Sequence, residues 1–286
     1  TGLAENCTVS GGAARAVTVP PGGTVDVAFD IGCGLAERIA FASGGTIGVI
    51  HADGSQRQWI TPGLAPAWSP DGTRLGYECG QDICAISPDG SGQSRLTFDG
   101  ASNHHPTWSP DGSKIAFAKT SSGAADLYVA GTIGSLTVRL THGVGFQGSP
   151  AWSPDGTKIA FDCRVDAGND DICVVNADGA GFARLTSGPA RDYGAAWKPD
   201  GSTLAFVTTR YGEDEIVLMS PAGGSVTRIG AGLPGFEPTW SPDGTHLAFA
   251  VSCFDWCSDQ IGVATSDGAN IRYVTNGDQP AWKPHP

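Results

Sequence analysis

The sequence predicts an all-β protein, a six-bladed β-propeller preceded by a short β-ribbon, and three observations support this prediction. First, the motif Trp-Ser-Pro-Asp-Gly recurs at intervals of 40 to 45 residues, which is the length of one propeller blade. Second, each repeat contains four short apolar runs separated by turn residues, as a four-stranded blade requires. Third, the two ends of the chain carry complementary parts of one more repeat.

The motif itself is predicted to be the turn of a β-hairpin. It begins at Trp68, Trp108, Trp152 and Trp240, with a variant at Trp197 and a truncated copy at Trp282. Proline fixes φ at the first central position of a turn, aspartate bonds to nearby backbone, and glycine accepts a positive φ. The repeated aspartates are therefore interpreted as turn formers and not as catalytic acids: Asp71, Asp111, Asp155, Asp200 and Asp243.

Composition and charge narrow the class of protein. The chain of 286 residues contains 42 glycines and 19 prolines, which fits many short strands joined by tight turns. It has no run of about 18 apolar residues, so no membrane span is expected. Its net charge of −12 argues against nucleic acids and anionic lipids as ligands, and it favours cations or basic polypeptide partners.

The eight cysteines indicate the compartment. They can be assigned to four local pairs, Cys7 with Cys33, Cys79 with Cys84, Cys163 with Cys173, and Cys253 with Cys257. Metal binding is the alternative, but the sequence has neither a Cys-x-x-Cys motif nor a histidine at zinc spacing. Disulfides are favoured, which implies the periplasm, the cell surface or the medium. The chain starts at Thr1 without a signal peptide, so we expect a mature or trimmed form.

Residues 1–35 do not follow the repeat and are predicted to form the ribbon. Alternating β-branched residues surround a turn at 20–23, and Cys7 and Cys33 would clip the two ends together. This pattern resembles the closing strands of immunoglobulin-like repeats in bacterial surface proteins. Because a two-stranded ribbon is only marginally stable alone, it is expected to pack on the propeller or to complete a sheet elsewhere.

Residues 36–286 are predicted to form the propeller, whose sixth blade is shared between the chain ends. Arg38–Phe41 reads as a second strand, and its missing first strand is Gln279–Lys283. This pairing would close the ring and remove its last exposed sheet edges. The five continuous blades begin near Pro66, Pro106, Pro150, Ala195 and Pro238. Their third and fourth strands are expected at Asp82–Ile86 with Ser94–Leu96, Asp126–Val129 with Thr137–Leu140, Asp171–Val175 with Ala183–Leu185, Glu215–Leu218 with Val226–Ile229, and Gln260–Ala264 with Ile271–Val274.

The pattern Trp-Ser-Pro-Asp-Gly-x-[Lys/Arg]-[Ile/Leu]-Ala-Phe resembles the WD40-like repeats of TolB-like propellers over residues 36–286. The resemblance implies a binding platform, since TolB is a periplasmic protein that receives protein and peptide partners at its propeller. Related blades form the gating propeller of prolyl-oligopeptidase-type peptidases, but here no Gly-x-Ser-x-Gly follows a strand and leads into a helix. The ribbon also differs from the N-terminal domain of TolB, so TolB's particular partners are not expected to carry over to this chain. A bacterial, extracytoplasmic protein is expected.

The segments that lead into each innermost strand are the candidate binding site, because they border the central channel and vary most between repeats. One equivalent position in the six repeats is held by Ala65, His105, Ser149, Gly194, Glu237 and Gln279. A ring of mixed histidine, glutamate and glutamine could hold a metal ion or grip a peptide, and a solvated mouth without a ligand is the alternative. The binding residues predicted at this mouth are Asn103, His104, His105, Gln147, Ser149, Asp192, Tyr193, Glu237, Asp278 and Gln279.

A second candidate site is the acidic loop between the second and third strands of the third blade. Hard oxygen ligands of this kind suit calcium, although their spacing matches no EF-hand and a solvated acidic rim is the alternative. The predicted ligands are Asp162, Asp166, Asn169, Asp170 and Asp171.

Three functions compete. The first is a non-enzymatic binding or scaffold protein that engages a protein or peptide at the channel mouth. The second is a glycan- or peptide-cleaving enzyme with His105 and Glu237 as its acid/base pair. A lyase for acidic polysaccharide should surround the channel with basic residues, and the lead-in segments supply only Arg191. The third is a surface or filament protein that assembles with itself through residues 1–35.

Overall fold

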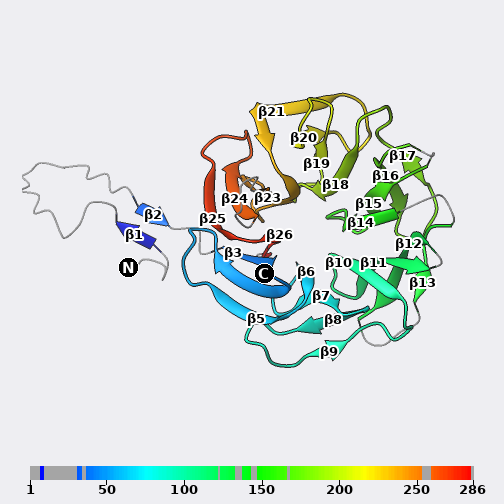
Figure 1. Ribbon diagram of the computed structural model, residues 1–286, viewed down its shortest axis with the longest axis horizontal. Helices are drawn as coiled ribbons and strands as arrows, with labels where there is room; N and C mark the ends of the chain where they lie inside the picture. The colour runs from blue at the N-terminus through cyan, green and yellow to red at the C-terminus, as the bar shows by residue number, and fades with distance from the viewer. Residues whose placement is uncertain are drawn as a thin grey trace, which may run out of the picture.

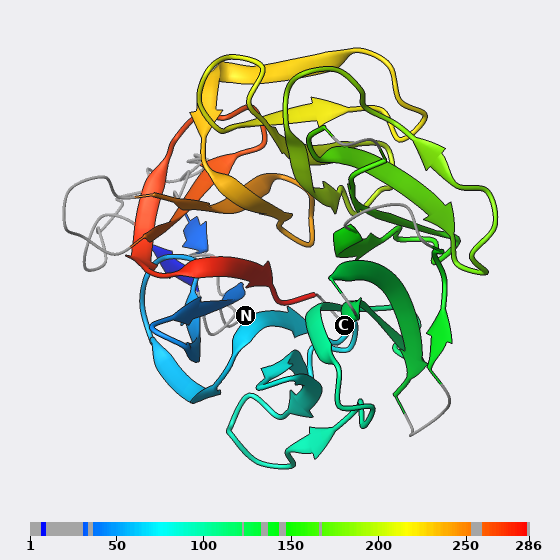
Figure 2. The same ribbon diagram turned by 45° about the vertical axis from the view of Figure 1, so that its right-hand side comes forward.

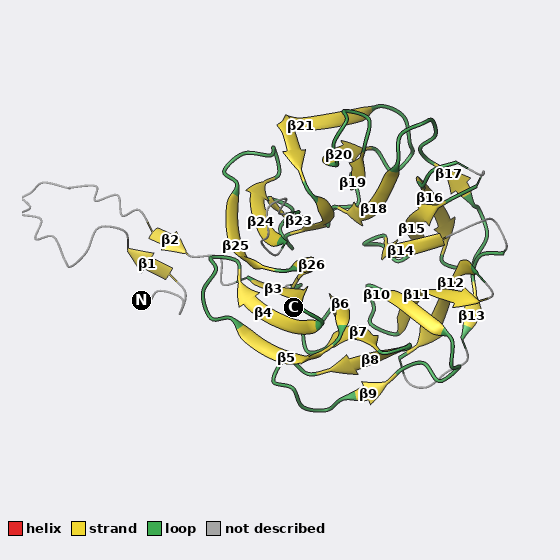
Figure 3. Cartoon of the chain, in the orientation of Figure 1, coloured by secondary structure: helices red, strands yellow, loops and turns green. Residues whose placement is uncertain are grey.

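Six four-stranded sheets surround a central axis (Figure 1). The computed structural model describes residues 37–121, 123–132, 137–142, 147–165, 168–252 and 259–284, together with the backbone of two strands at 7–9 and 31–33. Within these ranges every helix or strand assigned is a β-strand (Figure 3). The predicted all-β, six-bladed propeller is therefore confirmed.

We number the blades 1 to 6 in the order in which their innermost strands follow along the chain. Blade 1 contains β6 (Leu64–Trp68), β7 (Leu75–Cys79), β8 (Asp82–Ile86) and β9 (Ser94–Arg95). Blade 2 contains β10 (Ser102–Trp108), β11 (Lys114–Ser121), β12 (Ala124–Gly131) and β13 (Val138–Arg139). Blade 3 contains β14 (Gln147–Trp152), β15 (Lys158–Cys163), β16 (Asp171–Asn176) and β17 (Ala183–Arg184).

The remaining blades come from the second half of the chain and from its two ends. Blade 4 contains β18 (Asp192–Trp197), β19 (Leu204–Thr208), β20 (Glu215–Met219) and β21 (Val226–Pro234). Blade 5 contains β22 (Phe236–Trp240), β23 (His246–Val251), β24 (Gln260–Thr265) and β25 (Arg272–Asn276). Blade 6 contains β26 (Asp278–Trp282), β3 (Arg38–Ser43), β4 (Thr46–His51) and β5 (Gln58–Pro62).

Blade 6 closes the ring as the sequence predicts. Strand β26 pairs antiparallel with β3, with Trp282 opposite Ile39 and Ala281 opposite Ala40. Figure 2 shows the red strand β26 beside the blue strand β3. The two chain ends thus complete one sheet, and the inner edge of β3 is paired with β26.

The Pro-Asp-Gly turns are held by the side-chain contacts expected of turn formers. In blade 1 the Ser69 hydroxyl donates to Asp71 Oδ1 at 2.6 Å, and Thr73 N–H donates to the same oxygen at 3.1 Å. In blade 2 the hydroxyl of Ser109 lowers the pKa of Asp111 to about 2. A carboxylate that accepts several hydrogen bonds is stabilised in its ionised form, so these aspartates act as structural acceptors.

Tryptophans of the repeat connect neighbouring blades. The indole Nε1 of Trp108 donates to the carbonyl oxygen of Ala67 at 3.1 Å, which ties blade 2 to blade 1. Trp197 and Trp240 donate in the same way to residues of the preceding blades. The aromatic rings bury a large area against the fully buried phenylalanines and aliphatic residues of the second and third strands.

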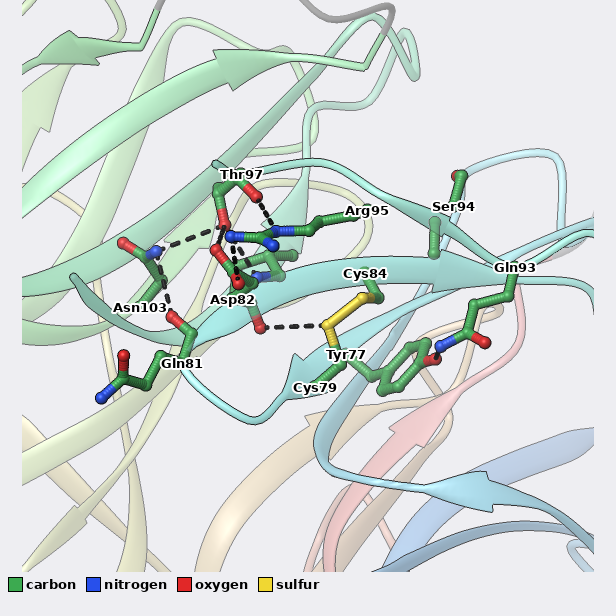
Figure 4. Close-up of a disulfide and its surroundings, with 12 residues drawn as sticks. Tyr77, Cys79, Gln81, Asp82, Cys84, Gln93, Ser94, Arg95, Thr97 and Asn103 are labelled. Carbon is green, nitrogen blue, oxygen red and sulfur yellow. Dashed lines mark hydrogen bonds and ion pairs between the residues drawn. A yellow bond between two sulfur atoms is a disulfide. The ribbon is translucent and has the colours of Figure 1, made fainter. Parts of the chain in front are cut away.

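The outer halves of blades 1–4 share an ion pair between a carboxylate at the start of the third strand and an arginine 13 residues later. Figure 4 shows it in blade 1, where Arg95 Nη2 lies 2.6 Å from Asp82 Oδ2. The hydroxyl of Thr97 also accepts the N–H of Ile83 at 2.9 Å, so a side chain replaces a strand carbonyl there. The equivalent pairs are Arg139–Asp126, Arg184–Asp171 and Arg228–Glu215.

Blades 5 and 6 have an aromatic residue where the other blades have the arginine. Trp59 lies opposite Gly48, and Tyr273 lies opposite Gly262. A Cβ on Gly48 would come within 2.7 Å of the Phe41 ring, and the Trp59 ring centroid lies 5.4 Å from that of Phe41. Glycine is therefore needed to let the two aromatic rings contact each other across the third strand.

Two of the four predicted disulfides lie in the described residues and are present. They join Cys79 to Cys84 and Cys163 to Cys173, each with a Cα–Cα distance of 5.8 Å. Cys253 and Cys257 lie outside the described residues.

The N-terminal residues contribute a separate two-stranded sheet. It pairs β1 (Cys7–Val9) with β2 (Ile31–Cys33) antiparallel, with the Cα atoms of Cys7 and Cys33 opposite each other. The side chains of this sheet and the rest of 1–36 lie outside the described residues. The predicted Cys7–Cys33 disulfide, the immunoglobulin-like character and the domain boundary at 35/36 therefore stay predictions. Among the described residues, no helix has the length and apolar character needed to cross a membrane.

Candidate functional site: the central channel

A cavity of about 340 Å³ lies at the centre of the propeller and is lined by residues of all six innermost strands. Its wall combines prolines, tryptophans and small residues with one residue from the same position of every blade. We call these six residues the channel ring: Ala65, His105, Ser149, Gly194, Glu237 and Gln279. The six positions that the sequence identifies as equivalent therefore meet at one cavity.

Every residue of the channel ring has a left-handed backbone conformation. The φ angles run from +45° at Ser149 to +65° at Gly194, and five of the six residues are not glycine. In each blade the pairing of the first and second strands shifts register at this point, which is the signature of a β-bulge. A left-handed residue before proline is unfavourable on its own, so the surrounding sheets hold the ring in this conformation.

Hydrogen bonds between adjacent blades fix the ring on the side of blades 5 and 6. There, ring side chains accept backbone N–H groups of the next ring residue. Glu237 Oε2 accepts the N–H of Gln279 at 2.7 Å, and Gln279 Oε1 accepts the N–H of Ala65 at 2.8 Å. Each long ring side chain therefore orients the ring residue of the following blade.

In blades 1 and 3 the second strand supplies the acceptor instead. Glu78 Oε1 accepts the N–H of His105 at 2.8 Å, and Asp162 Oδ1 accepts the N–H of Gly194 at 2.7 Å. Glu78 and Asp162 each precede a disulfide-bonded cysteine, so the disulfides lie directly beside these contacts. The role of Glu78 is not among the sequence-based predictions, although its place before a cysteine in the repeat could have shown it.

Burial shifts the pKa values of the ionisable groups at the channel. It raises the pKa of Glu237 to about 7, with further contributions from the carboxylates of Asp278 and Asp259. Burial also raises the pKa of Asp162 to about 7, although the Gly194 N–H and the Ser149 hydroxyl oppose this shift. Burial lowers the pKa of His105, which leaves its imidazole uncharged at neutral pH.

The structure separates the predicted binding residues into two groups. Four of them line the cavity: His105, Ser149, Glu237 and Gln279. Asn103, Gln147 and Asp192 are instead buried between strands, with at most 1% of their surface exposed. Asn103, for example, donates to the Gln81 carbonyl oxygen at 3.1 Å. They lie two residues before the ring, and the bulge separates them from the channel.

The other three predicted residues do not line the cavity either. His104 Nδ1 lies 3.2 Å from Glu78 Oε2. The hydroxyl of Tyr193 bonds to Asp214, and the Arg191 guanidinium lies 4.9 Å from the Tyr193 ring centroid. For Asp278, burial raises the pKa of the carboxyl group.

The described members of the predicted calcium set have different partners. Asp170 accepts from Arg164 and Arg191, and Asp171 pairs with Arg184. Asp162 accepts the N–H of the ring residue Gly194, and Asn169 donates to the Ala190 carbonyl oxygen. Asp166 lies outside the described residues. Across the described part of the chain no group of three or more His, Cys, Asp or Glu could hold a metal ion, so calcium stays a prediction.

Comparison with known families agrees with this architecture. A family model described as the TolB β-propeller domain matches residues 140–285, just over half of the chain. The chain belongs to this family. No curated protein matches this TolB-type chain.

Solved structures share the fold of this TolB-family propeller. TolB from Acinetobacter baumannii matches with a TM-score of 0.77 and 22% identity, over 88% of this chain and 68% of that one. A putative TolB from Agrobacterium tumefaciens matches with a TM-score of 0.73 and 23% identity, over 85% and 91%. A chain of a nidogen/laminin complex matches with a TM-score of 0.69 and 14% identity, over 86% and 98%. Enzymes, including an oligogalacturonate lyase, are also among the matches, so the shared fold alone does not decide function.

Proposed function

We propose that this TolB-family protein is an extracytoplasmic, non-enzymatic binding or scaffold protein that engages a protein or peptide at the mouth of its channel. The observation that carries the proposal is the channel ring. Six equivalent backbone positions meet at one cavity of about 340 Å³, yet they carry different side chains. A symmetric backbone with asymmetric side chains is a surface that can select one ligand orientation.

The ring is also built to be rigid. Four of its six left-handed residues are held by hydrogen bonds from the preceding blade, and two disulfides lie next to two of the acceptors. A preorganised site loses little conformational entropy when a ligand binds, because its backbone is already ordered. This rigidity favours recognition of an extended segment inserted along the axis.

The acid/base pair considered for an enzyme is placed unfavourably for proton transfer at one bond. His105 belongs to blade 2 and Glu237 to blade 5, three positions apart in a ring of six and therefore on opposite sides of the axis. Binding to both walls of the cavity requires only a ligand that spans it. This arrangement supports recognition more directly than catalysis.

Two features support an extracytoplasmic location for this function. Both disulfides in the described residues need an oxidising compartment to form and persist. The family to which the chain belongs takes its name from TolB, the periplasmic protein that the sequence repeats resemble. A periplasmic, surface-attached or secreted protein satisfies both.

A peptide-display selection against the full chain tests the proposal. Synthetic copies of the selected peptides are titrated calorimetrically into the wild type, Gln279→Ala and the control Gln58→Ala, which lies exposed on the outer strand β5. We expect Gln279→Ala to weaken binding about tenfold, equivalent to about 1.4 kcal/mol, and Gln58→Ala to leave it unchanged.

Hydrogen exchange on the wild-type protein supplies a readout that does not depend on how a variant folds. A bound peptide should protect the parts of β10 and β22 that contain His105 and Glu237. Failure to select any binding peptide, or protection confined to the outer strands, would overturn the proposed site.

A further inference from the structure

The cavity contains only two ionisable side chains among its lining residues. They are Glu237 and His105, and the remaining wall is formed by proline, tryptophan, alanine, glycine, serine, threonine and glutamine. Because burial lowers the pKa of His105, its imidazole contributes no positive charge at neutral pH. Among the described residues that line this cavity, the ionised form of Glu237 is therefore the one charged group at neutral pH.

Glu237 is incompletely paired within the described residues. Its Oε2 accepts the N–H of Gln279, and no Lys or Arg of the described chain forms an ion pair with it. A carboxylate offers about four lone-pair positions, so most of its acceptor capacity remains for a ligand. The neighbouring carboxylates of Asp278 and Asp259 oppose its ionisation, and a positive charge placed beside it would relieve this repulsion.

We propose that the cavity binds an ammonium group of the partner, a lysine side chain or a peptide N-terminus, against the carboxylate of Glu237. This inference rests on the proposed function and specifies the chemistry of the segment that enters the channel. The negative net charge of −12 attracts such a partner over long range, before the short-range contact forms.

The walls of the cavity also suit a lysine side chain. A lysine carries an apolar stem below a compact charged head, and the prolines and tryptophans of the wall can cover that stem. The head has three donors, and the carboxylate of Glu237 and the amide oxygen of Gln279, which belong to adjacent blades, can each accept one of them. The faces of the lining tryptophans add cation–π attraction for an ammonium group.

Two other cations fit less well. A divalent metal ion needs several oxygen ligands, and the described residues provide no group of three or more candidates. A guanidinium presents a planar fork that binds best through both carboxylate oxygens, and one of the two lone pairs of Glu237 Oε2 is already used by the N–H of Gln279. Binding of either cation is one of the outcomes that the test distinguishes.

The test uses four blocked tripeptide probes with the full chain. Acetyl-Ala-Lys-Ala-amide carries only a side-chain ammonium, and Ala-Ala-Ala-amide carries only an N-terminal one. Acetyl-Ala-Gln-Ala-amide and acetyl-Ala-Arg-Ala-amide are the neutral and guanidinium comparisons. Chemical-shift titrations are run with the wild type, Glu237→Gln and the control Glu213→Gln, which makes the same charge change at an exposed residue outside the cavity.

We expect at least one ammonium probe to bind at least tenfold more tightly than the glutamine probe. Glu237→Gln should abolish this difference, and Glu213→Gln should preserve it. Whichever ammonium probe binds more tightly identifies the source of the group. Binding should weaken as the pH falls below about 7, because Glu237 becomes protonated there. The other ionisable groups around Glu237 are Asp278 and Asp259 and, across the axis, His105.

Three results would overturn the inference. They are equal binding of the lysine and glutamine probes, arginine binding as tight as lysine, and ammonium binding unchanged in Glu237→Gln. Displacement of the lysine probe by millimolar calcium at equal affinity would assign the site to a metal ion instead. Display-selected peptides that still bind the ring would leave the proposed function intact, so the two failures are distinguishable. The probe comparison on the wild type decides between these outcomes even where Glu237→Gln fails to fold.

Discussion

Blades 1–4 and blades 5–6 meet the same structural requirement with different chemistry. At the outer strands, blades 1–4 join a buried carboxylate to an arginine 13 residues later, as in Asp171 and Arg184. In blades 5 and 6 the same two positions hold an uncharged residue and an aromatic one, Gln260 with Tyr273 and Thr46 with Trp59. Both members of the pair differ together, because an arginine without its carboxylate or a buried carboxylate without its arginine would be costly.

A related difference appears at the inner strands of four blades. Blades 1 and 3 use a second-strand carboxylate to accept the next ring N–H, and their own ring residues are the small Ala65 and Ser149. Blades 5 and 6 use the long ring side chains of Glu237 and Gln279 for the same purpose. These two long side chains therefore lie on one side of the cavity, which makes its wall asymmetric in a repetitive fold.

Removal of the arginine in blade 3 is expected to have the largest effect. Asp171 is completely buried, so Arg184→Ala leaves an uncompensated charge and should lower the free energy of unfolding by about 3–5 kcal/mol. Tyr273 holds the equivalent position in blade 5 but is about half exposed, and Tyr273→Ala should cost about 1 kcal/mol. Urea denaturation measures both. Equal losses would show that the two constructions do not differ energetically.

The ring N–H groups are accepted by a second-strand carboxylate in blade 3 and by a ring carboxylate in blade 5, and the two arrangements can be compared by the pH dependence of stability. Folding raises the pKa of Asp162 and of Glu237 to about 7, so the folded state holds more protons than the unfolded state between about pH 4 and 7. Stability should therefore decrease as the pH rises through this window, by about 3–4 kcal/mol per group. Asp162→Asn and Glu237→Gln should each flatten the decline in a melting series. A stability that increases from pH 4 to 7 in the wild type, with no change in either variant, would contradict this.

Gly262, which lies opposite Tyr273 in blade 5, should be sensitive to the addition of a single methyl group. A Cβ on Gly262 would lie 2.8 Å from Phe249 Cε2, so Gly262→Ala should cost roughly 1–2 kcal/mol through overpacking. Gly168 has open space around its Cβ position, and Gly168→Ala serves as the matched control with little expected change. Thermal melting of the two variants separates them. A neutral Gly262→Ala would mean that the Phe249 ring can move away from position 262 without cost.

The blades and their closure could be predicted from sequence because they depend on local signals that recur. Each Pro-Asp-Gly turn specifies its own hairpin. Near one end of the chain β3 has no first strand before it, and at the other end β26 supplies that strand. The outer ion pairs could also have been recognised, since their spacing of 13 residues is constant. Repetition made these features visible above the variation between blades.

The channel site was only partly predictable. The sequence identifies the six equivalent positions, but it does not show that each is left-handed, since the residue before a proline normally avoids that region. The bulge that results decides which neighbours face the cavity. Asn103 and Asp192 are buried for that reason, although their polar character suggested a ligand contact.

The seam of the ring and the ligand-facing wall share one strand. Nothing covalent joins β26 to β3, and β26 carries Gln279, whose side chain holds the ring residue of blade 1. A mechanical load applied to the last described residues would therefore reach the channel before any other blade is disturbed. Separation of this strand from β3 would remove one wall of the cavity, together with the contact that holds Ala65.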